Sequence, residues 1–311
     1  MSFKALVIGC GNIGSGYDFS NDQVLTHAKA FRLNPEIEFS VSDVNEKAAI
    51  ETATKYGVRY YTRLSDEELK EFNIISLCTS TKYHFEYLKR ISGLSSPFII
   101  CEKPVVATLN EVNALRTLEL DPQKILVNYI RRFQPGYHLL KHRLAEICHV
   151  EQINLINLKY HRGLLNSASH GLDLLTFLLE REVRFDEVQM LSKGFDAFET
   201  DPTIIGSFLL NGIPVMLQGF IDSTYSIFEV EIYTKSQKIL IENSGDTIKY
   251  YKTVDGVLFE DRNMRQEEVL KDYMVAVVEK ALSCMKGNSE TNFSSALQLN
   301  EEVLKLIETI K

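Results

Sequence analysis

The chain has 311 residues, of which 45% are hydrophobic and 24% charged. This is the composition of a globular protein with room for two domains. It contains no apolar run of about eighteen residues, so we expect no membrane-spanning segment and no membrane partner. The net charge of -8 argues against a nucleic acid as partner, because nucleic-acid binding depends on clustered cations.

The start of the chain is a short apolar run that passes directly into glycines and lacks the features of a signal peptide. We therefore expect a cytoplasmic protein. The five cysteines are scattered, and no Cys or His cluster has metal-ligand spacing. We expect reduced thiols and no metal site.

Residues 3–130 alternate between apolar runs and helical patterns. The predicted strands are Phe3–Ile8, Glu38–Val44, Asn73–Cys78, Phe98–Cys101 and Lys124–Tyr129. The predicted helices between them are Thr26–Leu33, Glu46–Tyr56, Tyr83–Ile91 and Leu109–Leu118. Apolar strands that alternate with helices are typical of βαβ units, so this half is predicted to form a doubly wound parallel sheet.

After about residue 150 the predicted strands follow one another more closely. They are Gln152–Tyr160, Val188–Lys193, Ile204–Leu210, Val215–Phe220, Phe228–Thr234, Lys238–Glu242 and Thr247–Lys252. Asn211-Gly212 and Ser244-Gly245-Asp246 are hairpin signals. Helices are predicted at Ser169–Leu179, Gln266–Met285 and Ser294–Ile310. This half is predicted to be an α/β domain with a large open, mainly antiparallel sheet.

A glycine motif follows the first strand. Gly9-Cys10-Gly11-Asn12-Ile13-Gly14 has the form G-x-G-x-x-G and precedes a βαβ series. In dinucleotide-binding folds the first glycine makes the tight turn, the second lets the backbone approach the pyrophosphate, and the third permits close helix–strand packing. We therefore predict that Gly9, Gly11, Asn12, Ile13 and Gly14 bind a dinucleotide rather than form a glycine turn of no function.

Asp43 ends the second predicted strand, where a carboxylate would accept hydrogen bonds from the adenosine ribose and repel a 2′-phosphate. The expected cofactor is therefore NAD, with NADP disfavoured. Asp43 lies 29 residues beyond Gly14, farther than the usual spacing of about 20. The excess falls in the polar stretch Ser15–Thr26, an insertion that could be either a lid or a plain surface loop.

Three further stretches bring the sequence close to a known family. Thr79-Ser80-Thr81-Lys82-Tyr83-His84 follows the third strand, Cys101-Glu102-Lys103-Pro104 follows the fourth, and Gly163…Asn166…His170…Asp173 opens the helix of the second half. In this order, behind the glycine motif, they resemble the glucose–fructose oxidoreductase / inositol dehydrogenase / MocA family over essentially the whole chain.

The resemblance implies a Rossmann domain, residues 1–127, followed by a substrate-binding and oligomerisation domain, residues 128–311, whose C-terminal helix could pack back on the first domain. It implies a homodimer or homotetramer formed through the second sheet. It places Glu102 and Lys103 beside the nicotinamide, with a cis Lys103–Pro104 bond. Thr79, Ser80 and His84 would line the cofactor cleft.

The second motif departs from the family pattern. The family has an Asp where this chain has Asn166. An amide carries no charge to stabilise an imidazolium or an ammonium, so the pKa of His170 is expected to be lower than in relatives. Lys103 and His170, with Asn166 as a neighbour that orients them, are the predicted catalytic residues. Taken alone, a histidine at a helix start is more often a surface or capping residue, and a single lysine is more often an ordinary surface residue.

Cationic and polar residues near the predicted domain boundary suggest a substrate with a carboxylate or phosphate. The predicted substrate-binding residues are Arg131, Tyr160, Arg162 and Asp173. The alternative is that they are solvated or structural residues.

The predicted protein is a nicotinamide-dependent oxidoreductase that transfers a hydride between NAD(H) and a hydroxyl-bearing carbon of a sugar, cyclitol or nucleotide sugar. Two alternatives stay open. One is a regulatory protein that binds NAD and a sugar without catalysis, and the other is a family member that performs NAD-assisted elimination or hydrolysis.

Overall fold

The structure is a computed structural model that describes residues 2–94, 97–185 and 188–310. The chain divides into two compact units: Met1–Ile130 with Asp272–Leu297, and Arg131–Lys271 with Gln298–Lys311. The first unit thus ends after residue 130 rather than 127, and it also includes a segment from near the C-terminus. None of the described helices is long and apolar enough to cross a membrane.

The first unit is built on a six-stranded parallel sheet in the order β3-β2-β1-β4-β5-β6. This is the Rossmann strand order, and it reverses between β1 and β4. The doubly wound sheet predicted from the sequence is therefore confirmed. Its strands are β1 (Phe3–Ile8), β2 (Ile37–Ser42), β3 (Tyr60–Tyr61), β4 (Ile74–Leu77), β5 (Phe98–Cys101) and β6 (Ile125–Val127).

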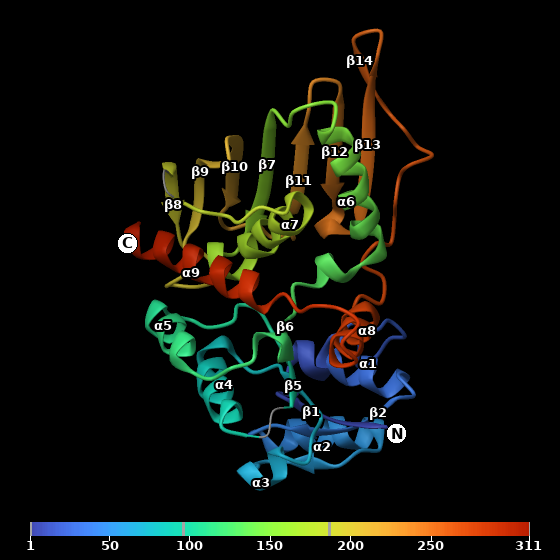
Figure 1. Cartoon of the computed structure of the whole chain (residues 1–311), viewed down its shortest axis with the longest axis vertical. Coiled ribbons are helices and arrows are strands. Elements are labelled where there is room, and N and C mark those ends of the chain that lie inside the picture. Colours follow the sequence, from blue (N-terminus) through green and yellow to red (C-terminus); the bar gives the residue numbers. More distant parts are fainter. Residues whose placement is uncertain (1, 95–96, 186–187, 311) are drawn as a thin grey trace. The chain divides into compact units, whose positions relative to one another are not determined.

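Helices surround this sheet (Figure 1). They are α1 (His27–Leu33), α2 (Glu46–Tyr56), α3 (Asp66–Leu69), α4 (His84–Ser92), α5 (Leu109–Thr117) and α8 (Met274–Met285). Helix α1 packs against α8, which connects the late segment to the start of the chain. The predicted helix Gln266–Met285 was too long, because its first eight residues form a β-bridge at Gln266 and turns.

The second unit is built on an eight-stranded sheet in the order β14-β13-β12-β11-β7-β10-β9-β8. Among the residues that the structure describes, only the β7–β10 pair of this sheet is parallel, so the predicted open, mainly antiparallel sheet is confirmed. Its strands are β7 (Leu155–His161), β8 (Gln189–Gly194), β9 (Thr203–Leu210), β10 (Ile213–Phe220), β11 (Phe228–Tyr233), β12 (Gln237–Glu242), β13 (Thr247–Val254) and β14 (Val257–Glu260).

Helices α6 (Pro135–Cys148) and α7 (Ser169–Leu179) pack on the second unit's sheet (Figure 1). A methyl group at Gly171 in α7 would lie 2.4 Å from the Leu158 side chain of β7, so helix and strand are in close contact. Sequence analysis missed α6, although proline at its first position and buried Tyr137, Leu140 and Leu144 are helix signals. The last helix, α9 (Phe293–Thr309), has residues in both units.

The other face of the second sheet carries an ion-pair network across β7, β11 and β12. Glu231 accepts hydrogen bonds from Asn157 (3.0 Å) and Lys238 (2.7 Å), and Lys159 pairs with Glu229 at 2.9 Å. Burial alone would raise the pKa of Glu231, but these hydrogen bonds and the two lysine charges lower it to about 2. The network keeps this half of the face polar.

The insertion Ser15–Thr26 is attached to the first unit at several points. The buried Asp18 carboxylate accepts hydrogen bonds from the amides of Leu25 (2.7 Å) and Thr26 (2.8 Å) and from the Thr26 hydroxyl (2.8 Å). The Val24 amide donates to Asp272 at 2.7 Å, and the Lys55 ammonium lies 3.9 Å from the centre of the Phe19 ring. These attachments are those of a fixed loop rather than of a hinged lid.

Replacing Asp18 with alanine would leave the buried Thr26 amide and the half-buried Leu25 amide without acceptors. We expect this to reduce the stability of the first unit by about 1–3 kcal/mol, seen as a fall of several degrees in Tm. Asp22→Ala is the matched control, because Asp22 is an exposed carboxylate of the same insertion. Equal Tm values for the two variants would show that Asp18 does not anchor the loop.

Candidate active site

The glycine motif lies at the carboxyl end of β1, at the reversal point of the first sheet. Gly9 has a φ of +102°, and a Cβ there would lie 2.7 Å from the Cys78 carbonyl oxygen at the end of β4. At Gly14 a Cβ would lie 1.9 Å from the Gly9 carbonyl oxygen. At Gly11 a Cβ would meet no atom within 4 Å. The fold thus requires glycine at positions 9 and 14, whereas Gly11 faces open space.

A π-helical turn, Asn12–Gly16, follows the second glycine. The amides of Ser15 (2.9 Å) and Gly16 (3.1 Å) donate to the Gly11 carbonyl oxygen. The first amides of any helical turn have no partner within the turn, and their positive ends attract anions. Asn12 and Ile13 stand at this start of the turn, where the sequence predicted a pyrophosphate.

Asp43 follows β2 and lies beside the glycine motif. One carboxylate oxygen accepts a hydrogen bond from the Cys10 amide at 2.7 Å, and the other accepts from the Asn45 amide at 2.8 Å. Each carboxylate oxygen can accept a second bond. Asp43 therefore holds the glycine motif through the Cys10 amide, and its oxygens can still accept hydrogen bonds from ribose hydroxyls.

His84 lies at the start of α4 and is completely buried. Its Nδ1 lies 3.0 Å from the Pro104 carbonyl oxygen, and its Nε2 lies 3.0 Å from that of Thr79. Burial lowers the pKa of His84, and the carbonyl oxygens only partly offset this. The ring thus bridges the loops that follow β4 and β5, and direct contact of His84 with a cofactor stays a prediction.

The loop after β4 offers a more direct sign of a ligand. Thr79 is half-buried and Ser80 exposed. The Thr79 hydroxyl oxygen is buried without a hydrogen-bond partner among the residues that the structure describes. A buried hydroxyl without a partner is unfavourable, and a bound cofactor would supply one.

Glu102 and Lys103 follow β5 at the same edge of the sheet. The carboxylate of Glu102 is buried and accepts hydrogen bonds from His27 Nε2 at 2.8 Å and Asn128 Nδ2 at 2.6 Å. Lys103 is half-buried, and its bond to Pro104 is cis, as the resemblance implies. All the predicted cofactor residues thus lie at the carboxyl ends of β1, β2, β4 and β5.

In the second unit, the motif that carries Asn166 and His170 wraps around a carboxylate that sequence analysis did not single out. Asp201, which is 7% exposed, accepts hydrogen bonds from the amides of Leu165 and Asn166, both at 2.8 Å. Gly163 has a φ of +88°, and a Cβ there would lie 2.1 Å from Asp201. Asn166 also donates from Nδ2 to the Arg162 carbonyl oxygen at 3.2 Å. Asp201 therefore holds the loop that leads into α7 and His170.

Two of the predicted substrate-binding residues are engaged in contacts within the second unit. The Asp173 carboxylate is bound by two nitrogens of the Arg132 guanidinium, Nη2 at 2.8 Å and Nε at 3.0 Å. Burial raises the pKa of Asp173 to about 6 against the opposing effect of the arginines. Arg131 donates to the Ser244 carbonyl oxygen at 2.6 Å, and its guanidinium lies 3.7 Å from the centre of the Phe228 ring.

Tyr160 and Arg162 differ from each other in accessibility. The Tyr160 hydroxyl is buried and both donates to the Ile204 carbonyl oxygen (3.1 Å) and accepts from the Ile204 amide (2.9 Å). Arg162 is exposed. Substrate binding by Arg131, Tyr160 and Asp173 stays a prediction that their contacts do not support, whereas Arg162 is open to a ligand.

The structure adds four residues that sequence analysis did not select: Asp18, His27, Asn128 and Asp201. His27 opens α1, and Asn128 follows β6. The positions of Asn128 and of Glu102, each just after a strand of the parallel sheet, could have linked them. Nothing in the spacing of Asp18 or Asp201 indicated their partners.

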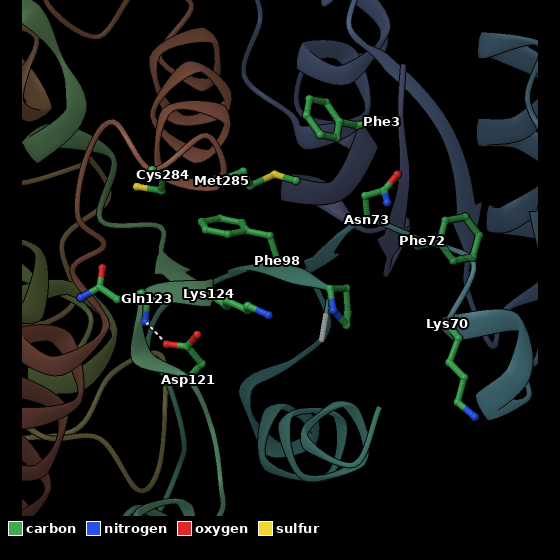
Figure 2. Close-up of a pocket in the computed structure, with 12 residues that line it drawn as sticks. Phe3, Lys70, Phe72, Asn73, Phe98, Asp121, Gln123, Lys124, Cys284 and Met285 are labelled. Atoms are coloured by element: carbon green, nitrogen blue, oxygen red, sulfur yellow. Dashed lines mark hydrogen bonds between the residues drawn. The ribbon is translucent and has the colours of Figure 1, made fainter. Parts of the chain in front are cut away.

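A cavity of about 430 Å³ lies in the first unit, away from these residues (Figure 2). Phe3, Asn73, Phe98 and Lys124, which line it, stand at the amino ends of β1, β4, β5 and β6. The predicted cofactor residues stand at the carboxyl ends of their strands, where ligands of open α/β sheets bind. The cavity is therefore not the cofactor site. No group of acidic, histidine or cysteine side chains among the described residues could hold a metal ion.

Comparison with known proteins agrees with this geometry. A family model described as "Oxidoreductase family, NAD-binding Rossmann fold" matches residues 3–129. Residues 3–129 thus resemble the NAD-binding domain of the glucose–fructose oxidoreductase / inositol dehydrogenase / MocA family. The predicted resemblance, the nicotinamide-dependent oxidoreductase and the NAD-binding domain are confirmed.

Relatives of this family extend the likeness beyond the first unit. An inositol 2-dehydrogenase from Paracoccus denitrificans is 26% identical over 247 residues, and the match covers 72% of this chain and 69% of the relative. The solved structure of a UDP-N-acetylglucosamine 3-dehydrogenase from Acidithiobacillus ferrooxidans matches with a TM-score of 0.75 at 17% identity, covering 99% of this chain and 96% of that one. A 3-ketoreductase from Actinomadura kijaniata, in complex with NADP and TDP-benzene, matches with a TM-score of 0.74 at 10% identity, covering 99% and 98%. The solved structures support the fold of both units.

Gly11 allows a clean test of the cofactor site. We expect Gly11→Val to keep the wild-type Tm, because the new side chain enters open space, and to weaken NADH binding about tenfold or more. Gly14→Ala, by contrast, should destabilise the fold through its clash with the Gly9 carbonyl. Fluorescence titration with NADH and thermal unfolding measure both effects. Undiminished binding by Gly11→Val would place the dinucleotide elsewhere.

Proposed function

We propose that the protein is an NAD-dependent dehydrogenase that moves a hydride between NAD(H) and a hydroxyl-bearing carbon of a sugar, cyclitol or nucleotide sugar. The observation that carries the proposal is the Glu102–Lys103 pair at the carboxyl end of β5, on the same sheet edge as the open glycine motif. The matched relatives are dehydrogenases and reductases by name. This favours hydride transfer over a regulatory role or NAD-assisted elimination.

The residues at this edge fit a dinucleotide. The space at Gly11 and the amides at the start of the π-helical turn suit a pyrophosphate. Asp43 would accept hydrogen bonds from the adenosine ribose, and its charge would disfavour the 2′-phosphate of NADP. The unpartnered hydroxyl of Thr79 would gain a partner.

The nicotinamide, when bound, supplies the carbon that accepts or donates the hydride. In the oxidative direction the substrate carbinol loses a hydride to the cofactor and a proton to a base, which leaves a ketone. We assign that proton to neutral Lys103 or to His170, and in the reductive direction the protonated form of the same residue returns it. General acid–base help of this kind contributes about 10²–10⁴-fold to the rate.

Asn166 and Arg162 would complete the substrate side. Asn166 carries no charge, so it orients rather than ionises its neighbours, and its loop is fixed by Asp201. The exposed guanidinium of Arg162 suits a carboxylate or phosphate on the substrate. A nucleotide sugar or sugar acid therefore fits the exposed groups better than an uncharged cyclitol does.

Lys103→Met keeps the approximate volume of the side chain and removes the ammonium. In a screen of free sugars, cyclitols and nucleotide sugars with NAD or NADH, we expect wild-type turnover with at least one substrate. Lys103→Met should reduce it by about 10²-fold or more, with NADH affinity nearly unchanged. His170→Ala is the companion variant: a small loss would assign the proton to Lys103 alone. Full turnover by Lys103→Met would contradict its catalytic role.

We also propose a homo-oligomer formed through the second sheet. The outward face of β9 presents Ile205 and Leu209, which are 38% and 59% exposed, in register with Gln218 and Pro214 of β10. Ile205 and Leu209 lie on one face of β9 on either side of Ser207, and exposed apolar residues on one sheet face are typical of an interface. Light scattering should give the mass of a dimer or tetramer for the wild type and a smaller mass for Leu209→Lys. A monomeric wild type would contradict the proposal.

A further inference from the structure

A buried polar cluster lies beneath the predicted nicotinamide end of the site. His27 Nε2 lies 2.8 Å from Glu102 Oε1, and His27 Nδ1 lies 3.0 Å from Ser76 Oγ. Asn128 Nδ2 donates to the same Glu102 oxygen at 2.6 Å. His27 and Ser76 are 0% exposed and Asn128 is 1% exposed. The cluster joins the start of α1 to the ends of β4, β5 and β6, and the proton transfers proposed above do not use it.

The hydrogen bonds fix where the protons are. An ionised carboxylate can only accept hydrogen bonds, so His27 Nε2 must carry a proton and donate a hydrogen bond to Glu102. The Ser76 hydroxyl can either donate to Nδ1 or accept from it, which suits both the neutral and the charged imidazole. Among the residues described, both side-chain hydrogen bonds of Glu102 fall on Oε1. The bonds orient the carboxylate and leave Oε2 available to the site.

The ionisation of Glu102 depends on these donors. Burial alone would raise the pKa of Glu102, but the hydrogen bonds from His27 and Asn128 and the charges of His27 and Lys103 hold it below its usual value. Other titratable groups that sense the Glu102 charge face it from neighbouring elements: His84 of α4, Cys78 after β4, and Cys101 of β5. Burial raises the pKa of both thiols and lowers that of His84, so none of these three brings a compensating positive charge.

The insertion determines where His27 lies. Asp18 binds the amide and hydroxyl of Thr26, and the Thr26 hydroxyl in turn caps α1 by accepting from the Lys29 amide at 3.3 Å. His27 is the next residue in the chain. The anchor that keeps the insertion in place therefore also fixes the backbone from which the imidazole reaches Glu102.

We propose that His27 is a positioning residue of the hydride-transfer site, which holds Glu102 charged and oriented so that Lys103 keeps a fixed negative neighbour. The proposal rests on the proposed function for its effect on catalysis. Its structural part, that His27 holds Glu102 ionised, concerns only residues of the first unit.

The test compares His27→Leu, which fills the space without a donor, with His27→Gln, which restores an N–H donor. Protein labelled with ¹³C at glutamate Cδ is titrated by NMR, and the Glu102 signal is assigned by its absence in Glu102→Gln. We expect the Glu102 midpoint to rise by about one pH unit or more in His27→Leu and to return toward the wild-type value in His27→Gln. Asn128→Asp, which places a second carboxylate against Glu102, should also raise it.

His27→Leu and Asn128→Asp should also move the acidic limb of the turnover profile upward in pH, in parallel with the Glu102 midpoint. Asn292→Ala is the control for general destabilisation. Asn292 is a buried amide of the same unit that binds both backbone groups of Val127, so its loss should lower Tm without moving the limb.

An unchanged Glu102 midpoint in His27→Leu would overturn the proposal. A raised midpoint with an unmoved turnover limb would overturn its catalytic part and leave His27 as a structural residue. If His27→Leu does not fold, His27→Asn, whose shorter side chain withdraws the donor from Glu102, replaces it, and an unchanged Glu102 midpoint there would likewise overturn the proposal. Absence of wild-type turnover with every sugar and cyclitol would refute the proposed function, and the glutamate titration would still decide whether His27 sets the ionisation of Glu102.

Discussion

A carboxylate that leaves water must be given hydrogen-bond donors, and Glu102 receives them from two parts of the chain that are far apart in sequence. His27 donates from the first helix and Asn128 from the end of the last strand of the first sheet. Because one charge needs both donors, the start of α1 and the ends of β5 and β6 are fixed relative to one another. Loss of either donor would leave a buried charge poorly compensated.

Three further carboxylates fix the loops that carry the site residues. Asp43 binds the amides of Cys10 and Asn45, and Asp18 binds those of Leu25 and Thr26. In the second unit, Asp201 binds the amides of Leu165 and Asn166. In each case one short side chain satisfies two backbone donors, in a loop for Asp43 and Asp18 and at the start of the π-helical turn Leu164–Ala168 for Asp201. The loops therefore have defined conformations where the predicted cofactor and substrate residues occur.

Much of the first unit could be predicted from the sequence, because each strand of a parallel sheet that is buried on both faces is a continuous run of apolar residues. The doubly wound parallel sheet followed from the βαβ pattern, although the two-residue strand β3 was not predicted, and the glycine motif marked the turn after the first strand. The start of α8 was misplaced because apolar residues continue before Met274, although residues 266–273 form a bridge and turns. Helix α6 was missed although its buried Tyr137, Leu140 and Leu144 recur at helical spacing.

The motifs of the candidate site could be recognised in the sequence, but the distant residues that hold those motifs in place could not. The predictions of Lys103, Asn166 and His170 as catalytic residues came from motif order. Asp201 lies more than thirty residues from the amides that it binds, and His27 lies 75 residues from Glu102. Such pairs depend on tertiary packing, and a single sequence contains no periodic signal for them. The fixed state of the insertion also depended on Asp18, whose partners no spacing rule identifies.

A crystal structure of the protein with NAD tests the central claim most directly. The account predicts the pyrophosphate over Gly11 at the start of the π-helical turn, the adenosine ribose on Asp43, and the nicotinamide beside Glu102 and Lys103. A dinucleotide bound at the amino edge of the sheet, in the cavity lined by Phe3, Phe98 and Lys124, would contradict it.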